Sequence, residues 1–365
     1  MIAFLLIVFA LYFATIAILI FGFTKVKSYD EIGLKPKTKF TIIVPFRDED
    51  ENLPLLLKSF SKLNYPCELF EVLLVDDDSK QKFQVASLEF RVSIIDNKRT
   101  SNSPKKDAIL TAMRQVTTDW VITTDADCTV NKNWLLTLDN YIQTHNVSMI
   151  AGAVTYDCND YFMHQFQQLD MASLQGATIG SFGINKGFMC NGANFAYTKS
   201  LFQELNGFEG NDKIASGDDV FLLQKAINKA SEQVHYLKSK NTIVTTQALN
   251  SWKALFYQRV RWASKTNSYQ SIYGKMVAII VFMGNLGWLC AVIWSIIDFE
   301  KAKMLLPIII LKMGTDGVLI LQSDSFLNLK RTNYLFLGSL FYPFFSSSVA
   351  LYSLFGKYEW KGRRF

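Results

Sequence analysis

FTIIVP, at Phe40–Pro45, is an uninterrupted apolar and β-branched run that ends in proline. Such a run is typical of a strand that is buried on both faces of a parallel sheet. The elements predicted after it are a helix at 52–63, strands at 71–75 and 91–95, a helix at 107–116 and a strand at 120–124. Because strands and helices alternate, we expect an α/β domain with a doubly wound parallel sheet. Ligands of such sheets bind beyond the carboxyl ends of the strands.

The composition separates an apolar start and an apolar end from a mixed middle. Half of the 365 residues (50%) are hydrophobic, and the excess lies in the first 23 residues and roughly the last 90. The net charge of +6 accompanies these apolar flanks, which favours a membrane rather than a nucleic acid as the partner. The five cysteines are scattered and odd in number, so we expect neither a zinc site nor a disulfide framework, and a reducing compartment is favoured.

The first 24 residues, 1–24, are predicted to form a transmembrane anchor. Residues 1–23 carry no charge and are long enough to cross a bilayer. They lack the leading positive charge and the small cleavage-site residues of a signal peptide. The lysines that follow are Lys25, Lys27, Lys35, Lys37 and Lys39. The positive-inside rule therefore puts the N-terminus outside and the central domain in the cytoplasm, as in an integral protein of the plasma (inner) membrane.

The segment 275–356 is predicted to hold two to three further transmembrane helices. Uncharged runs of spanning length occupy 276–297 and 334–355. A third apolar run, at 304–321, is shorter and contains charged residues. Three crossings would leave the four basic residues of the tail 357–364 outside, against the positive-inside rule. Either the short run is re-entrant or the rule is broken here.

The charged residues of this short run are Lys312 and Asp316, which are four positions apart. On a helix they would share one face, where their charges partly neutralise each other. Two interpretations remain open. The pair is either a tolerated buried pair within a packed helical bundle or part of a path for a substrate.

Acidic residues follow two of the predicted strands. Asp125 and Asp127 flank a small residue at the end of the strand 120–124. Alternate side chains leave a strand on the same face, so both carboxylates can point at one cation. Hard oxygen ligands suit Mg²⁺ or Mn²⁺ on a diphosphate. No Gly-x-Gly-x-x-Gly follows the first strand and no P-loop occurs, which disfavours a dinucleotide oxidoreductase and a P-loop ATPase.

Three further charged clusters have both a structural and a functional interpretation. Asp76–Asp78 follows the second strand and is either a turn or a set of ligands for a cation or a base. Asp218 and Asp219 begin a predicted helix, where they either cap the helix or supply a general base. Lys105 and Lys106 precede the helix at 107–116 and are either solvated or in contact with a nucleotide.

The segment 251–274 mixes aromatic and basic residues, which indicates an amphipathic helix at the membrane interface. Gln258, Arg261 and Trp262 are spaced i, i+3 and i+4 and would share one face of that helix. A plain membrane-surface helix is one interpretation. The other is a binding face, because the guanidinium can contact a diphosphate and the indole can stack on a sugar ring.

Seven motifs together resemble the family 2 inverting glycosyltransferases, in their membrane-attached branch with a QxxRW motif. The resemblance covers roughly residues 39–273. The motifs are Val44–Glu49, Val75–Ser79, Lys105–Ala108, Asp125–Asp127, Cys190–Asn194, Asp218–Asp219 and Gln258–Trp262. The resemblance implies a GT-A fold, which is a Rossmann-like nucleotide-diphospho-sugar transferase domain, at 38–250. It also implies transmembrane helices at both ends of the chain.

The resemblance also implies the residues that bind the donor, a nucleotide-diphosphate sugar. Residues that would hold the nucleoside are Glu49, Asp76 and Asp77, with Lys105 on the base or the phosphates. Asp125 would contact the ribose and the metal, Asp127 would contact the metal, and Arg261 would brace the leaving diphosphate. The metal would be Mg²⁺ or Mn²⁺, and uridine diphosphate is the expected carrier by family habit.

Catalysis and acceptor binding are implied in the same way. Asp219 resembles the catalytic base, and it follows Asp218 where relatives often have glutamate. Gln258 and Trp262 would form the acceptor platform. The residues Cys190, Asn191 and Gly192 would belong to a loop that lines the acceptor site. That loop departs from the Cys-Gly-Ser form of cellulose synthases, which leaves the identity of the acceptor open.

The expected reaction is a single in-line displacement that inverts the anomeric carbon, with a lipid or lipid-linked glycan as acceptor at the cytoplasmic membrane face. A processive polysaccharide synthase is the enzyme alternative, although it needs a channel of more helices than the three or four predicted. A non-catalytic membrane partner of a polysaccharide complex is the alternative from another class. The full set of carboxylates disfavours that alternative.

Overall fold

The computed structural model describes residues 2–85, 87–211, 217–265, 270–327 and 334–355, and the backbone of 359–360 and 363–364. The chain divides into two compact units. The sheet unit consists of Lys27–Asp157 and Met189–Gln247. The helical unit consists of Met1–Val26, Cys158–Phe188 and Ala248–Phe365.

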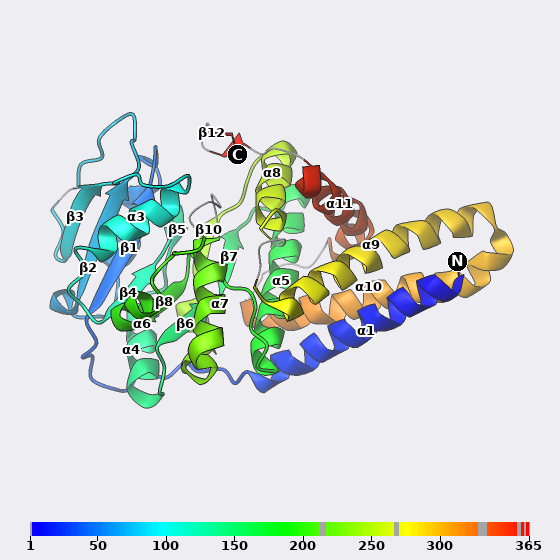
Figure 1. Cartoon of the computed structure of the whole chain (residues 1–365), viewed down its shortest axis with the longest axis horizontal. Coiled ribbons are helices and arrows are strands. Elements are labelled where there is room, and N and C mark those ends of the chain that lie inside the picture. The colour runs from blue at the N-terminus through cyan, green and yellow to red at the C-terminus, as the bar shows by residue number, and fades with distance from the viewer. Residues whose placement is uncertain are drawn as a thin grey trace. The chain divides into compact units, whose positions relative to one another are not determined.

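A seven-stranded sheet forms the centre of the sheet unit, with strand order β3-β2-β1-β4-β8-β6-β9 (Figure 1). In chain order the strands are β1 (Phe40–Phe46), β2 (Phe70–Asp76), β3 (Arg91–Asp96), β4 (Trp120–Thr123), β6 (Met149–Gly152), β8 (Phe195–Thr198) and β9 (Val234–Leu237). The four strands predicted from the sequence are confirmed, each within one residue at either end.

Only part of this sheet is parallel. β3, β2, β1 and β4 pair in parallel, as the sequence predicts. β8 pairs antiparallel with both β4 and β6, so the predicted parallel pairing is confirmed for the first four strands and does not extend to β8. The sequence signal stops at residue 124, and β8 arrives from a distant segment of the chain. The result is a mixed α/β sheet.

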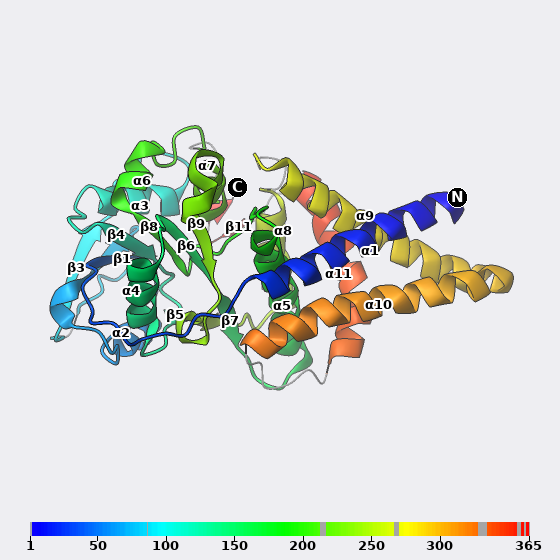
Figure 2. The same cartoon turned by 90° about the horizontal axis from the view of Figure 1, so that it is seen from below.

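Helices cover both faces of the sheet. α2 (Leu53–Phe60) and α4 (Trp134–Thr144) share one core with the even-numbered side chains of β1 and β2, and the rings of Phe60 and Trp134 stack at 6.2 Å. Odd-numbered side chains point to the other face because strand residues alternate. In Figure 2 that face carries α3 (Pro104–Met113), α6 (Lys199–Glu204) and α7 (Asp218–Ala230).

The boundary of α3 corrects one prediction. The helix begins at Pro104, a residue whose fixed φ favours the first helical position, and not near Asp107. Lys105 and Lys106 therefore lie inside its first turn. Short elements complete the unit: a three-stranded sheet of β5 (Cys128–Thr129), β10 (Val244–Gln247) and β7 (Val154–Asp157), and 3₁₀ turns at Cys67–Leu69, Ser231–Gln233 and Lys240–Thr242.

Within the described residues, the helical unit contains four helices that are long and apolar enough to cross a membrane. They are α1 (Ile2–Lys25), α9 (Ile272–Ile297), α10 (Phe299–Leu327) and α11 (Leu335–Phe355). The short run at 304–321 lies within α10, a single helix of 29 residues. At 1.5 Å per residue this helix is about 44 Å long, more than a bilayer core requires. The side chains of the tail at 357–364 lie outside the described residues.

α10 also carries the predicted intramembrane pair. Lys312 Nζ lies 2.8 Å from Asp316 Oδ2, which confirms that the two share a helix face. The same ammonium donates to Asn285 Oδ1 of α9 at 2.7 Å, and Tyr12 of α1 donates to Asp316 Oδ1 at 2.5 Å. Lys312 is only 2% exposed. Three of the four apolar helices are thus joined by one buried polar network.

Two further helices pack with the apolar ones. α5 (Phe162–Gly183) lies within the predicted segment 38–250 but groups with the helical unit. Its Gly180 approaches α1 so closely that an added Cβ would stand 2.3 Å from Leu19 O, so the helices meet backbone to backbone. α8 (Trp252–Ala263) occupies the first half of the predicted interface segment 251–274, of which 266–269 lie outside the described residues. A hairpin of β11 (Glu359–Trp360) and β12 (Arg363–Arg364) follows α11.

Candidate active site

The carboxyl ends of three neighbouring strands form one edge of the sheet unit. β2, β1 and β4 run in parallel, with Phe46 opposite Asp76 and Ile43 opposite Thr123. The acidic segments after β2 and β4 therefore begin at the same edge as the turn after β1. Open α/β sheets bind their ligands at this edge.

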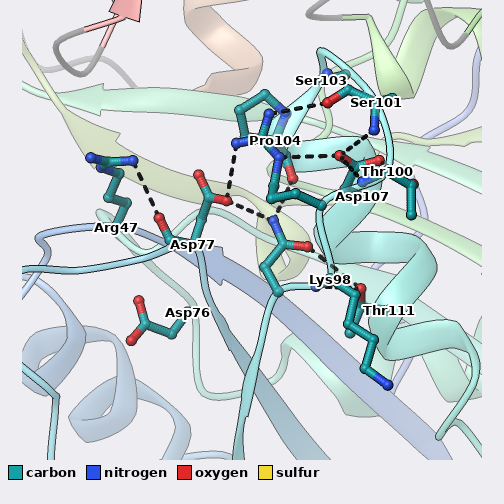
Figure 3. Close-up of polar contacts among 12 residues, drawn as sticks. Arg47, Asp76, Asp77, Lys98, Thr100, Ser101, Ser103, Pro104, Asp107 and Thr111 are labelled. Carbon is teal, nitrogen blue, oxygen red and sulfur yellow. Dashed lines mark hydrogen bonds and ion pairs between the residues drawn. The ribbon is translucent and has the colours of Figure 1, made fainter.

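Asp77 follows β2 and is held from three directions (Figure 3). Its carboxylate accepts a hydrogen bond from Asn97 Nδ2 at 2.7 Å and lies 3.6 Å from Arg99 Nη1. Its carbonyl oxygen accepts a hydrogen bond from Arg47 at 3.4 Å. Burial raises the pKa of Asp77, against the hydrogen bond from Asn97 and the charges of Arg99 and Arg47.

Asp76 ends β2 and is 2% exposed. Its Oδ1 accepts the backbone N–H of Ser79 at 2.9 Å, and its Oδ2 lies 3.0 Å from Lys82 Nζ. Burial alone would raise the pKa of Asp76, but the hydrogen bonds from Ser79 and the ammonium of Lys82 outweigh it and hold that pKa below its ordinary value. The pKa values of the two adjacent aspartates are therefore shifted in opposite directions.

Asp107 shapes this edge, although no role for it was predicted from the sequence. Its Oδ2 accepts the backbone N–H groups of Thr100 and Ser101 at 3.0 and 2.9 Å and lies 3.2 Å from Arg99 Nε. Burial opposes its ionisation, but the N–H groups of Ser101 and Thr100 hold the pKa of Asp107 below its ordinary value. The acid fixes the segment from which Arg99 reaches Asp77. A buried acid in the first turn of a helix is the sequence signal that could have found it.

Glu49 lies in the turn between β1 and α2, where its Oε2 accepts a hydrogen bond from Asn52 Nδ2 at 2.6 Å. The preceding Asp48 has a φ of 51°, a left-handed conformation that aspartate tolerates better than most residues. Its N–H donates to Ser79 Oγ at 3.0 Å, which ties the turn after β1 to the turn after β2. Glu49 and the two aspartates after β2 thus belong to two linked turns.

Lys105 connects two of the predicted acids. Its Nζ lies 2.6 Å from Asp125 Oδ1 and 3.8 Å from Asp218 Oδ2, and 18% of its side chain is exposed. Burial alone would lower the pKa of Lys105, but the charges of Asp125, Asp218 and Asp219 raise it above its ordinary value. Lys105 is therefore an ammonium. It forms ion pairs with Asp125 and Asp218, and the charge of Asp219 also stabilises it.

Gly192 brings the predicted acceptor loop against the same group. Its N–H donates to Asp219 Oδ2 at 2.9 Å, while the N–H of Val220 donates to Oδ1 of the same acid at 2.8 Å. A Cβ added at Gly192 would stand 3.3 Å from Lys105 Nζ, Asp218 Oδ2 and Asp219 Cβ. Glycine is the residue that leaves this space open. Both oxygens of Asp219 are thereby fixed in direction.

The loop from Cys190 to Asn194 is anchored on the sheet. Thr123 Oγ1 of β4 donates to Gly192 O at 2.8 Å, and Asn191 Oδ1 accepts the N–H of Ala193 at 3.0 Å. Cys190 and Asn191 are half-buried. The structure therefore places Gly192 at the cluster of acids. The hydrogen bonds of Thr123 and Asn191 restrict the conformation of the loop that contains it.

Asn194 ends this loop and has a structural part that the sequence did not indicate. Its Nδ2 donates to Ala153 O and Thr242 O at 2.8 and 2.7 Å, and its Oδ1 accepts from Trp134 Nε1 at 3.2 Å. These bonds connect three segments beneath the cluster. A buried amide with all these partners holds the loop in register.

Asp125 and Asp127 lie in a turn, not within β4. β4 ends at Thr123, and the N–H of Cys128 bonds to Asp125 O at 3.2 Å, so strand alternation does not align the two carboxylates. Asp127 Oδ1 is 3.7 Å from Cys128 Sγ. Burial raises the pKa of that thiol, so it is kept neutral.

The donor set suits one kind of metal site. Across the described part of the chain, no group of three or more His, Cys, Asp or Glu residues is placed to hold a metal ion. Two neighbouring carboxylates, Asp125 and Asp127, fit instead a Mg²⁺ or Mn²⁺ ion that shares its coordination with substrate phosphates and water.

Gln258, Arg261 and Trp262 lie on α8, which belongs to the helical unit, and all three are half-buried. The helix itself confirms their predicted spacing on one face. Its start is capped by Ser251 Oγ, which accepts the N–H of Ala254 at 3.5 Å. Their approach to the carboxylates of the sheet unit stays a prediction.

The sheet unit is similar in sequence to known proteins. Residues 41–205, from β1 to the end of α6, match the family described as "Glycosyl transferase family 2". The probable glycosyltransferase YdaM of Bacillus subtilis (strain 168) is 23% identical over 248 residues, which are 65% of this chain and 57% of that protein. The poly(ribitol-phosphate) β-N-acetylglucosaminyltransferase TarS of Staphylococcus aureus (strain Mu50) is 30% identical over 118 residues, 31% of this chain and 20% of that protein.

A solved structure shares the fold. The mannosyltransferase PcManGT of Pyrobaculum calidifontis aligns with a TM-score of 0.59 at 14% identity, over 97% of this chain and 98% of that one. The sequence matches span 57% of YdaM and 20% of TarS. The likeness in structure covers nearly the whole chain, and the family match covers the segment that contains Glu49, Asp76 and Asp125. Residues 41–205 thus match the glycosyl transferase family 2, and the chain shares its fold with a mannosyltransferase of known structure, which confirms the predicted GT-A fold.

Proposed function

We propose that the chain is a membrane-bound inverting glycosyltransferase. It moves a sugar from a nucleotide-diphosphate sugar to a lipid or lipid-linked glycan acceptor at the cytoplasmic membrane face. The observation that carries the proposal is the cluster in which Lys105 contacts Asp125 and Asp218 while Gly192 fixes Asp219. It combines a cation for a phosphate with an oriented carboxylate for a proton.

Asp219 is the general base. A carboxylate has about four lone pairs, and here one on each oxygen accepts a backbone N–H, from Gly192 and Val220. These bonds aim the remaining lone pairs without consuming them. As the acceptor hydroxyl attacks the anomeric carbon, its proton goes to Asp219. The bond from that carbon to the diphosphate oxygen breaks, and the electron pair leaves with the diphosphate, so the anomeric configuration inverts.

The leaving diphosphate is bound by cations. The ammonium of Lys105 interacts with the phosphates as well as with the acids, and Arg261 of α8 contacts the same diphosphate. Asp125 and Asp127 hold Mg²⁺ or Mn²⁺, which when bound supplies positive charge to the diphosphate. Glu49, Asp76 and Asp77 hold the nucleoside at the edge formed by β1 and β2.

The acceptor side is supplied by Gln258, Trp262 and the loop at Cys190, Asn191 and Gly192. Four helices in the described part of the chain are long and apolar enough to cross a bilayer, which supports a lipid acceptor. The lysines after α1 support a cytoplasmic position in a plasma membrane by the positive-inside rule. PcManGT is described with GDP-Man and Mn²⁺, and TarS is a β-N-acetylglucosaminyltransferase, so guanosine and uridine donors both enter the test.

The test is a thermal-shift and product assay on the full chain in lipid nanodiscs. UDP-GlcNAc, UDP-glucose and GDP-mannose are offered with and without Mn²⁺, and a ligand that binds the native state raises the melting temperature by mass action. Dioleoylglycerol and octyl glucoside serve as acceptor probes. We expect one donor to give both a shift and a glycosylated product of inverted configuration.

The size of the product separates this proposal from a processive synthase. A single added sugar supports transfer to a lipid, and a ladder of products indicates polymerisation instead. If no donor shifts the melting temperature and none is consumed, with or without acceptor, the proposal of a glycosyltransferase fails.

A further inference from the structure

The helix α8 carries a residue more deeply buried than the predicted motif residues beside it. Arg259 is 6% exposed, whereas Gln258, Arg261 and Trp262 are half-buried. A guanidinium cannot lose its proton in a protein, so a buried arginine must be compensated by its surroundings. The contacts of Arg259 therefore show which groups compensate its charge and which side chains it holds in place.

One guanidinium connects three side chains. Arg259 Nε donates to Asp170 Oδ2 of α5 at 2.5 Å. Its Nη1 donates to the side-chain oxygen of Gln258, the preceding residue of α8. Its planar group lies over the ring of Trp262, with Cζ 4.2 Å from the ring centroid. The two residues proposed for the acceptor platform are thus both in contact with the same arginine.

The arginine is in turn fixed by a polar face of α5. Asp170 is 6% exposed, and Gln167 and His164 precede it at intervals of three residues, which puts all three on one side of the helix. Gln167 Nε2 donates to Leu249 O at 2.8 Å, while its Oε1 accepts the N–H of the same residue at 2.9 Å. His164 Nε2 contacts Asn250 Oδ1 at 2.7 Å.

These contacts hold both the start and the middle of the motif helix. The bonds of Gln167 and His164 fix the two residues before the cap of α8, and the bond of Asp170 fixes its second half. Apolar packing closes the same interface, where Phe166 of α5 meets Leu255 and Val260 in one buried cluster. The α5 face therefore sets the position of α8 and, through Arg259, the direction of two side chains on it.

Stability alone does not account for such a pair. Burying two charges costs desolvation energy that their attraction barely offsets, and apolar replacements of buried pairs are often neutral or stabilising. Direction is what a guanidinium adds, because its planar fork can donate in two directions while its face stacks on an aromatic ring. A lysine could meet Asp170 but could not also hold Gln258 and Trp262 in this way.

We propose that Arg259, locked by Asp170, is a positioning residue that orients Gln258 and Trp262 for the acceptor. This inference rests on the proposed function. In this role Arg259 would touch neither the donor nor the reacting atoms. It acts through its neighbours, so its loss affects acceptor binding before it affects the donor.

The experiment compares acceptor-dependent transfer with acceptor-independent donor hydrolysis in the full chain in nanodiscs. The probes are the donor identified in the panel above and octyl glucoside as acceptor. For Arg259→Lys we expect the acceptor KM to rise about tenfold or more, with donor KM and hydrolysis within twofold of wild type. Lys303→Gln, which breaks the exposed ion pair with Glu300, is the matched control and should change neither.

A reversed pair separates positioning from simple ion pairing. Asp170→Arg combined with Arg259→Asp keeps both charges but moves the guanidinium to α5, away from Gln258. We expect this variant to recover the melting temperature of wild type while its acceptor KM stays high. Recovery of the acceptor KM overturns the proposal, as does an Arg259→Lys variant with an unchanged acceptor KM. Absence of both transfer and hydrolysis in wild type counts against the proposed function instead.

Discussion

The sheet unit and the helical unit each bury charged groups, but they balance them differently. In the sheet unit Lys105 contacts Asp125 and Asp218, and Asp219 adds a third negative charge nearby. In the helical unit Arg259 meets one carboxylate, that of Asp170. The first group has more acid than base, and the second is matched one to one.

Exposure follows the same division. Asp125 has 41% of its side chain exposed, whereas Asp170 and Arg259 have 6% each. Unbalanced carboxylates at a partly open edge have residual capacity for a cation, which a metal and the cations around a diphosphate can fill. A matched pair closed to solvent has no such capacity and can only fix the groups around it. The difference separates a site that binds from a contact that positions.

The largest effect is expected when the oriented base of the sheet unit is removed. Asp219→Asn keeps the shape of the side chain, and its single amide oxygen can still accept the N–H of either Gly192 or Val220. The amide cannot accept the acceptor's proton, and general-base catalysis is typically worth 10²–10⁴-fold. We expect transfer to fall by roughly 10³-fold while the donor-induced thermal shift persists. Transfer at the wild-type rate would remove Asp219 from this role.

The next effect concerns the unbalanced acids themselves. Asp127→Ala deletes one of the two carboxylates proposed for the metal, whose charge stabilisation is worth several kcal/mol, and each 1.4 kcal/mol is tenfold in rate. We expect activity to fall by roughly 100-fold and to lose its response to Mn²⁺ in a titration from micromolar to millimolar metal. The exposed Lys229→Gln, which breaks a surface pair with Glu204, is the control. An Asp127→Ala enzyme still stimulated by Mn²⁺ would contradict the assignment.

The sequence predicted those features of the sheet unit that depend on residues close together in the chain. β1 and β2 and the acids after them follow from apolar runs ended by aspartates, and these patterns lie within a few residues. The Asp170–Arg259 contact of the helical unit was not predictable in this way, because the two residues are 89 positions apart and no local pattern pairs them. Likewise, the sequence predicted only that a helix begins near Asp107. It did not predict that the carboxylate of Asp107 accepts the N–H groups of Thr100 and Ser101 and so fixes the segment before the helix.

The same limit applies to the sheet and to one turn. β8 joins β4 and β6 antiparallel through pairings across a long stretch of sequence, so alternation of nearby elements could not reveal it. The spacing of Asp125 and Asp127 at the end of a strand predicts that they point the same way, but the bond from the N–H of Cys128 to Asp125 O turns the chain at this point. Residue type indicated the chemistry, whereas tertiary hydrogen bonding decided the geometry.

A matched pair in the apolar helices allows a test of stability. Lys312→Met leaves the half-buried Asp316 without its cation, although Tyr12 still donates to it. Removing one partner of a buried pair typically costs 3–5 kcal/mol, so we expect a loss of about 3 kcal/mol. Lys312→Met combined with Asp316→Leu should regain most of it, since no charge is left uncompensated. Thermal unfolding in nanodiscs measures both, and a double variant no better than the single one would indicate a binding role for the pair.

The smallest effect concerns the adjacent aspartates after β2, whose pKa values move in opposite directions. Ser79 and Lys82 outweigh burial and lower the pKa of Asp76, so its contribution to stability is full above its unfolded pKa and is lost as the pH falls through the folded one. Burial raises the pKa of Asp77, so its folded state holds the proton longer and its contribution declines as the pH rises from its unfolded pKa through the folded value. Melting temperatures of the full chain between pH 3 and pH 6 should therefore rise less steeply with pH in Asp76→Asn and more steeply in Asp77→Asn than in wild type. Parallel curves for the two variants would show that these carboxylates do not differ as their contacts require.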